Sequence, residues 1–170
     1  MPDFTWPEAL WDQFGGAIDM LERAIVAFPE AVWSDRSRNP EVWAMAFHTV
    51  FWLDYYLADD PKSFAPPAPF GLEEMDPAGV LAPNPFDRAD VLAYLRDLRE
   101  RCRTLILGLT AETAMQPRKF GGVQGSTVES LLYSLRHLQH HTGQLNLLLR
   151  QTIDSAPLWV RRAGQVPPPR

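Results

Sequence analysis

Three of the four histidines lie in one segment, residues 135–149, whose leucines recur at the spacing of a helix. Side chains four residues apart on a helix lie on the same face, about 5 to 6 Å apart at Cβ. His137 and His141 have this spacing, whereas His140 is expected on the side opposite the leucines. Two imidazoles on adjacent turns can bind one cation. The spacing therefore predicts that His137 and His141, and not His140, share a ligand.

A tight metal site needs a third ligand, and the only histidine left is His48, in a separate apolar segment. Three imidazoles from two facing helices would leave a coordination position open for water or substrate, which is the layout of a catalytic metal centre. A pair of histidines four residues apart also arises by chance, and a lone histidine on an apolar helix is more often a hydrogen-bonded core residue. The residues alone leave a metal centre and ordinary packing both open.

Several other kinds of site lack the residues they require. The sequence has no His-Glu-x-x-His metalloprotease motif, no Glu-x-x-His motif for a di-iron centre and no evident nucleophilic triad. Cys102 is the only cysteine, which excludes an internal disulfide and an all-cysteine zinc site. The glycine-rich residues 119–125 lack the lysine and hydroxyl residue that close a phosphate-binding loop.

Composition indicates one domain with a sizeable core, since the 170 residues are 46% hydrophobic. The formal net charge of −5 offers no basic surface, so we expect no nucleic-acid partner. The N-terminus lacks a signal-peptide pattern, and no charge-free apolar run reaches the length of about 18 residues that a membrane span needs. We therefore expect no membrane partner and a cytoplasmic location.

Four long segments have the apolar period of amphipathic helices. They cover residues 5–28, 41–57, 87–109 and 126–153, and each begins at or just after a start signal, at Thr5, Asn39, Asp87 and Ser126. Residues 110–125 are expected to be a linker, because a proline and three glycines break any helix there. Almost no segment alternates between apolar and polar residues. The fold class predicted is all-α, a four-helix bundle.

Residues 59–87 contain seven prolines and show no sustained period, which predicts a long connection that drapes over the bundle. Its length would let the third helix start at the same end as the second, which gives a long crossover connection between helices 2 and 3. We further expect Phe64, Phe70 and Met75 of this loop to shape the entrance of the metal pocket.

The second helix is apolar nearly all round, so it is either central or covered by the following loop or by a second subunit. Together with six tryptophans and nine phenylalanines, this predicts a homodimer. The bundle is assigned to residues 1–153. Residues 154–170 are assigned to a C-terminal extension, with a short packed turn at 158–162 and a mobile tail from Gly164.

Two phrases of the sequence resemble a known family, the DinB-like superfamily of damage-inducible, metal-dependent four-helix bundle proteins, over roughly residues 6–151. One is the aromatic segment 43–56 around His48, and the other is His137-Leu-Gln-His-His141-Thr-Gly143-Gln144-Leu. In the family the second phrase reads His-x-x-x-His, then Arg or another residue, then Gly-Gln, and Thr142 stands at the variable place. The resemblance implies a bundle with a crossover and a divalent metal, zinc or nickel, bound by His48, His137 and His141.

The resemblance also suggests supporting residues around the metal. Gln144 could hydrogen-bond to a ligand histidine or to bound water, and Gly143 could let a neighbouring helix approach. Solvent exposure for Gln144 and simple packing for Gly143 are the alternatives. Tyr55 and Asp54, one to two turns beyond His48, are weaker candidates that could equally be bundle contacts.

The family implies an enzyme that acts on a small-molecule substrate. A metal-activated thiolate, supplied by a low-molecular-weight thiol, would make it an S-transferase or isomerase, and metal-bound water would make it a hydrolase. The alternative is a non-enzymatic stress-response or binding protein whose histidine triad is structural or vacant. No catalytic residue beyond the metal ligands is predicted.

Overall fold

The computed structural model describes residues 5–165, and these are mostly helical, as the predicted fold class requires. Four long helices account for most of the described chain: α1 (Trp6–Ala27), α3 (Val42–Leu57), α4 (Arg88–Leu107) and α6 (Thr127–Ile153). Three short helical turns connect them: α2 (Glu30–Trp33), η1 (Glu73–Met75) and α5 (Ala111–Ala114).

Two of the long helices, α4 and α6, begin where the sequence supplies a side chain for the free amides of the first turn. The Asp87 carboxylate accepts a hydrogen bond from the Ala89 N–H at 2.7 Å, and the Ser126 hydroxyl accepts one from the Glu129 N–H at 3.3 Å. Each bond satisfies a donor that has no partner within the helix. α6 ends at Asp154, whose φ of 53° is left-handed and stops further helix growth.

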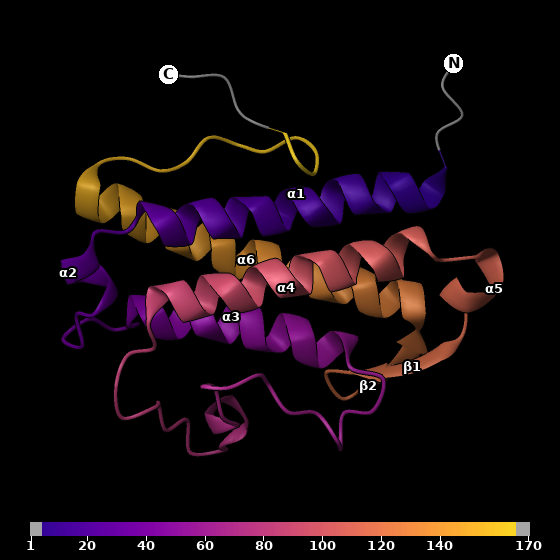
Figure 1. The fold of residues 1–170 in the computed structure, drawn as a ribbon, viewed down its shortest axis with the longest axis horizontal. Coiled ribbons are helices and arrows are strands. Elements are labelled where there is room, and N and C mark those ends of the chain that lie inside the picture. The colour runs from indigo at the N-terminus through magenta and orange to yellow at the C-terminus, as the bar shows by residue number, and fades with distance from the viewer. Residues whose placement is uncertain (1–4, 166–170) are drawn as a thin grey trace.

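The four long helices lie side by side, with α1 against α4 and α6, and α3 against α4 and α6 (Figure 1). Their facing sides form one apolar core whose largest members are fully buried. The core includes Phe14, Ile18, Leu21, Trp43, Phe47, Phe51, Leu95, Leu98, Leu138 and Leu145. The leucine stripe of α6 therefore faces the core, which fixes the direction in which its histidines point.

The outer side of α3 is covered by the long connection, residues 58–87, which lies along it in Figure 1. Phe70 stacks on Phe47 with ring centroids 4.9 Å apart, and Phe64 meets Phe51 edge-on at 5.2 Å. Aromatic side chains of α3 that would otherwise face water are buried by these contacts. The loop is thus anchored to the helix that carries His48.

Residues 117–126 differ from the linker that the sequence predicts. Strands β1 (Pro117–Phe120) and β2 (Val123–Ser126) pair as an antiparallel hairpin, with Phe120 opposite Val123. Gly121 and Gly122 have φ values of 50° and 78°, which two-residue hairpin turns favour. These glycines break a helix, as the sequence predicts, and they also form the hairpin turn.

The C-terminal extension packs on α1 (Figure 1). The Ala163 N–H donates to the Asp12 carbonyl at 2.9 Å, and the Gly164 N–H donates to the Asp19 carboxylate at 2.6 Å. Val160 is buried in an extended segment. Gly164, where the tail was predicted to begin, is therefore held in place, and residues 166–170 lie outside the described part of the chain.

No helix in the described range 5–165 combines the length and the apolar character that crossing a membrane demands.

Candidate metal centre

Three histidines from two helices meet in one cluster. α3 supplies His48, and adjacent turns of α6 supply His137 and His141. The ring centroid of His48 lies 5.3 Å from that of His137 and 4.7 Å from that of His141, and the latter two are 4.5 Å apart. One nitrogen of each ring lies within 4.8 Å of the others. His140 is exposed and takes no part in this group.

The spacing between the two α6 histidines suits a shared ion. Nε2 of His137 and Nε2 of His141 are 3.2 Å apart. Two nitrogens bound tetrahedrally at 2.0–2.1 Å from one zinc ion would be separated by roughly 3.3 Å. Without an ion, the same distance allows an N–H···N hydrogen bond between the rings. The pair is therefore arranged as metal ligands would be, with little movement needed.

Hydrogen bonds at the opposite ring nitrogens orient two of the three imidazoles. Nδ1 of His141 lies 2.7 Å from Oε1 of Gln144, and Nδ1 of His48 lies 2.6 Å from Oε2 of Glu74. Both oxygens accept hydrogen bonds, so Nδ1 carries the proton in each ring. The lone pair is then on Nε2, which is free to bind a metal.

Burial keeps the α6 histidines neutral. Burial, and after it the neighbouring histidines with His141 first, together lower the pKa of His137 to about 4. Burial also lowers the pKa of His141, partly offset by its hydrogen bond to Gln144. Since only the neutral imidazole binds a metal, both shifts favour the ligand form at neutral pH.

Glu74 belongs to the site and was missed by the sequence analysis. It lies in η1, inside the long loop, with a side chain only 12% exposed. No spacing rule links an irregular loop to a histidine 26 residues away. The only signal was an acidic pair, Glu73 and Glu74, in a proline-rich segment.

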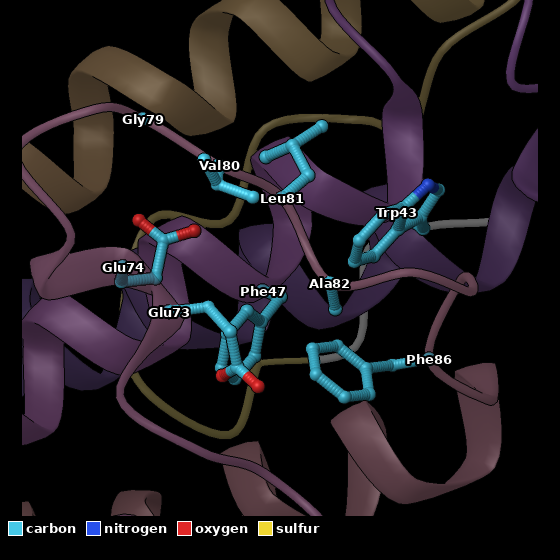
Figure 2. A pocket seen from close by; sticks show the side chains of 9 residues that line it. All are labelled: Trp43, Phe47, Glu73, Glu74, Gly79, Val80, Leu81, Ala82 and Phe86. Atoms are coloured by element: carbon cyan, nitrogen blue, oxygen red, sulfur yellow. The ribbon is translucent and has the colours of Figure 1, made fainter.

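The loop residues predicted to shape the entrance of the metal pocket are placed by their contacts, which leave that role a prediction. Phe64 and Phe70 pack on the aromatic side chains of α3, and Met75 is 41% exposed. Glu74 lines a small pocket between segment 79–82 and α3 (Figure 2). Glu74 therefore contacts Nδ1 of His48 and also lines this pocket.

Of the weaker candidates, Tyr55 contacts the rings of Trp52, Tyr56 and Phe64. It is the next residue, Tyr56, whose ring meets His137 edge-on, with centroids 5.6 Å apart. Trp52 lies 6.1 Å from His48. Aromatic rings therefore flank the cluster on the α3 side.

Two further candidates have other surroundings. Asp54 accepts a hydrogen bond from the Tyr94 hydroxyl at 2.6 Å and pairs with Arg101 at 2.9 Å, so it is a bundle contact. Gly143 is exposed, and a Cβ added there would meet no atom within 4 Å. No helix of the described chain approaches Gly143.

Comparison with known proteins places this arrangement in a family. A family model described as the DinB superfamily matches residues 13–145. The chain belongs to the DinB superfamily. The matched range contains all three clustered histidines and Gln144 of this DinB superfamily member, and it leaves out the C-terminal extension. A search of curated proteins found no match.

Proposed function

We propose that this DinB superfamily protein is a metal-dependent enzyme that acts on a small molecule, with a divalent ion held by His48, His137 and His141. The observation that carries the proposal is the convergence of one nitrogen from each ring to within 4.8 Å. Three imidazoles leave a coordination position for a further ligand, as catalytic sites require. Zinc or nickel suits an all-imidazole donor set.

When bound, the ion would lower the pKa of a coordinated thiol or water molecule and so provide a nucleophile at neutral pH. The chain's own residues prepare the site for this. Glu74 and Gln144 hold the Nδ1 protons of His48 and His141, which directs Nε2 inward. The rings of Trp52 and Tyr56 flank the cluster on the α3 side.

Two routes use the same three ligands. We propose transfer or isomerisation through a low-molecular-weight thiol as the first, in line with the family resemblance, and hydrolysis as the second. A thiol that raises turnover and slows metal exchange would favour the first route. Turnover with water alone would favour the second.

The competing function is a non-enzymatic stress-response or binding protein with a structural or vacant triad. Metal-loaded protein should be assayed on small electrophiles with and without a panel of low-molecular-weight thiols. We expect turnover by the wild type and none by His48→Ala. Absence of turnover under every condition, in protein shown to hold metal, would favour the non-enzymatic function.

We also propose that the helices form a four-helix bundle with a crossover between α3 and α4. The contacts of α1 and α3 with both α4 and α6 support the bundle. The path of residues 58–87 back along α3 in Figure 1 supports the crossover. The homodimer and the cytoplasmic location stay predictions, and a species of about 19 kDa in sedimentation at micromolar concentration would contradict the dimer.

A further inference from the structure

The long loop reaches the histidine cluster through one acidic side chain. Oε2 of Glu74 lies 2.6 Å from Nδ1 of His48, and the Glu74 side chain is 12% exposed. A short, mostly buried bond between a carboxylate and an imidazole is stronger than one between neutral groups. Of the two Nδ1 partners in the site, Gln144 is a neutral amide on the same helix as its histidine, whereas Glu74 is a carboxylate from a different segment.

The turn that carries Glu74 is itself ordered by backbone hydrogen bonds. The Met75 N–H donates to the Leu72 carbonyl at 2.9 Å, and the Asp76 N–H donates to the Glu73 carbonyl at 3.0 Å. In Figure 2, Glu73 and Glu74 are neighbours whose carboxylates point in different directions, that of Glu73 beside Phe47. Glu74 contacts His48, whereas Oε2 of Glu73 is buried without a hydrogen-bond partner, so Glu73→Ala removes a carboxylate from the same turn without removing the contact with His48.

We propose that Glu74 is a positioning residue for the metal centre and that it couples the conformation of the loop to metal binding. Its carboxylate accepts the Nδ1–H of His48, keeps Nε2 directed at His137 and His141, and makes the ring a better donor. It also places a negative charge on the far side of the His48 ring from the proposed ion, whose two positive charges three neutral imidazoles would not balance. This role rests on the proposed function of the three histidines.

Coupling between two sites is reciprocal, so if Glu74 raises the affinity for the metal, the metal must stabilise the turn that holds Glu74. The amides of Met75 and Asp76, which are bonded within the turn, report on this. Zinc should slow their hydrogen exchange in the wild type. The same slowing should be absent when residue 74 has no acceptor.

The test compares Glu74→Ala, Glu74→Gln and the matched control Glu73→Ala, each prepared as full-length, metal-free protein. Zinc affinity is measured by competition with a chromophoric chelator, and the His48 tautomer is read from side-chain ¹⁵N NMR. We expect Glu74→Ala to weaken zinc binding about 10- to 100-fold. Glu73→Ala should stay within about threefold of the wild type, as for a residue with no contact to the ligands.

Glu74→Gln keeps an acceptor oxygen but loses the charge, so it should retain the Nδ1–H tautomer and bind zinc with intermediate affinity. It also serves if Glu74→Ala fails to fold, which melting curves of the metal-free proteins reveal. Zinc-dependent slowing of exchange at residues 75 and 76 should persist in Glu73→Ala and vanish in Glu74→Ala.

If the wild type and Glu74→Ala bind zinc with equal affinity, this inference is wrong, but the proposal of a metal centre is unaffected. Equal losses in Glu73→Ala and Glu74→Ala would also overturn it, because the turn, not the carboxylate, would then matter. A wild type that binds no zinc would overturn the metal centre itself and this role with it.

Discussion

The histidine cluster contains its own control, because His140 neighbours two candidate ligands without joining them. We consider four single substitutions to alanine, at His48, His137, His140 and His141. His140 is exposed, and although its ring lies 4.9 Å from that of His141, it is outside the group whose nitrogens lie within 4.8 Å of one another. The clustered three should therefore bind metal, and His140 should not.

The magnitude follows from the roles of the residues. Replacing a partner that merely orients a ligand typically costs 10- to 100-fold in metal affinity. Removal of a ligand itself, which leaves only two imidazoles, should therefore cost more than about 100-fold, or about 2.7 kcal/mol. His140→Ala removes an exposed side chain and should change affinity by less than about threefold.

The assay is elemental analysis of protein purified without a histidine tag, together with melting temperature before and after a chelator. We expect one ion per chain in the wild type and in His140→Ala, and a fall in melting temperature when the chelator is added. The other three variants should hold no metal and should not respond to the chelator.

Two results would refute this reasoning. One is a wild type that holds no metal after incubation with zinc or nickel. The other is a His140→Ala variant that loses metal as completely as His137→Ala. If the histidines serve only packing, the cost of each substitution should instead follow burial, and the chelator should change nothing.

Three further predictions concern stability, each measured by chemical denaturation of metal-free protein. The pKa of His137 is lowered to about 4 in the folded protein, from a value near 6.5 in the unfolded chain. Between these pH values the unfolded chain binds more protons than the folded one, so the free energy of unfolding falls as the pH falls. We expect a loss of about 1 to 2 kcal/mol from pH 6.5 to pH 4, after allowance for solvent screening. His137→Ala should flatten this fall, and an unchanged slope would contradict the assignment. Tyr94→Phe should lower the free energy of unfolding by about 1 to 3 kcal/mol, because the buried Asp54 carboxylate loses a hydrogen-bond donor at 2.6 Å. A loss below about 0.5 kcal/mol would mean that Arg101 alone is a sufficient partner for Asp54. Gly122→Ala should destabilise the protein by about 1 kcal/mol, because φ at this residue is 78°. Gly143→Ala should stabilise it by about 0.5 to 1 kcal/mol, because this residue is exposed on α6 with open space around it. Effects of the same sign for both substitutions would contradict this account.

The sequence was most informative where structure is set by neighbours along the chain. Ser126 and Asp87 cap helices because their side chains reach amides two or three residues away. The pairing of His137 with His141, and the exclusion of His140, follow from the period of one helix. None of these features depends on how the helices pack.

The features that sequence reasoning missed depend on contacts between distant segments or on residues with two uses. Gly121 and Gly122 break helices and also suit a hairpin turn, and only pairing of Pro117–Phe120 with Val123–Ser126 decides between these. The hydrogen bond of Gly164 to Asp19 spans 145 residues, and no local pattern indicates it. Glu74 is a case of the same kind, since its position relative to His48 is set by the path of an irregular loop.

The proposed metal centre also combines residues that are close in sequence with residues that are distant. His137, His141 and Gln144 lie within eight residues on α6, so the helix alone brings together two of the proposed ligands and one orienting side chain. His48 and Glu74 join them only when α3 packs on α6 and the loop closes over α3. On the role proposed for Glu74, a loop that moved away from α3 would leave the α6 half of the site in place and would remove the hydrogen bond that orients the His48 ring. Affinity for the metal should for that reason be controlled from the loop, although two of the three ligands lie on another helix.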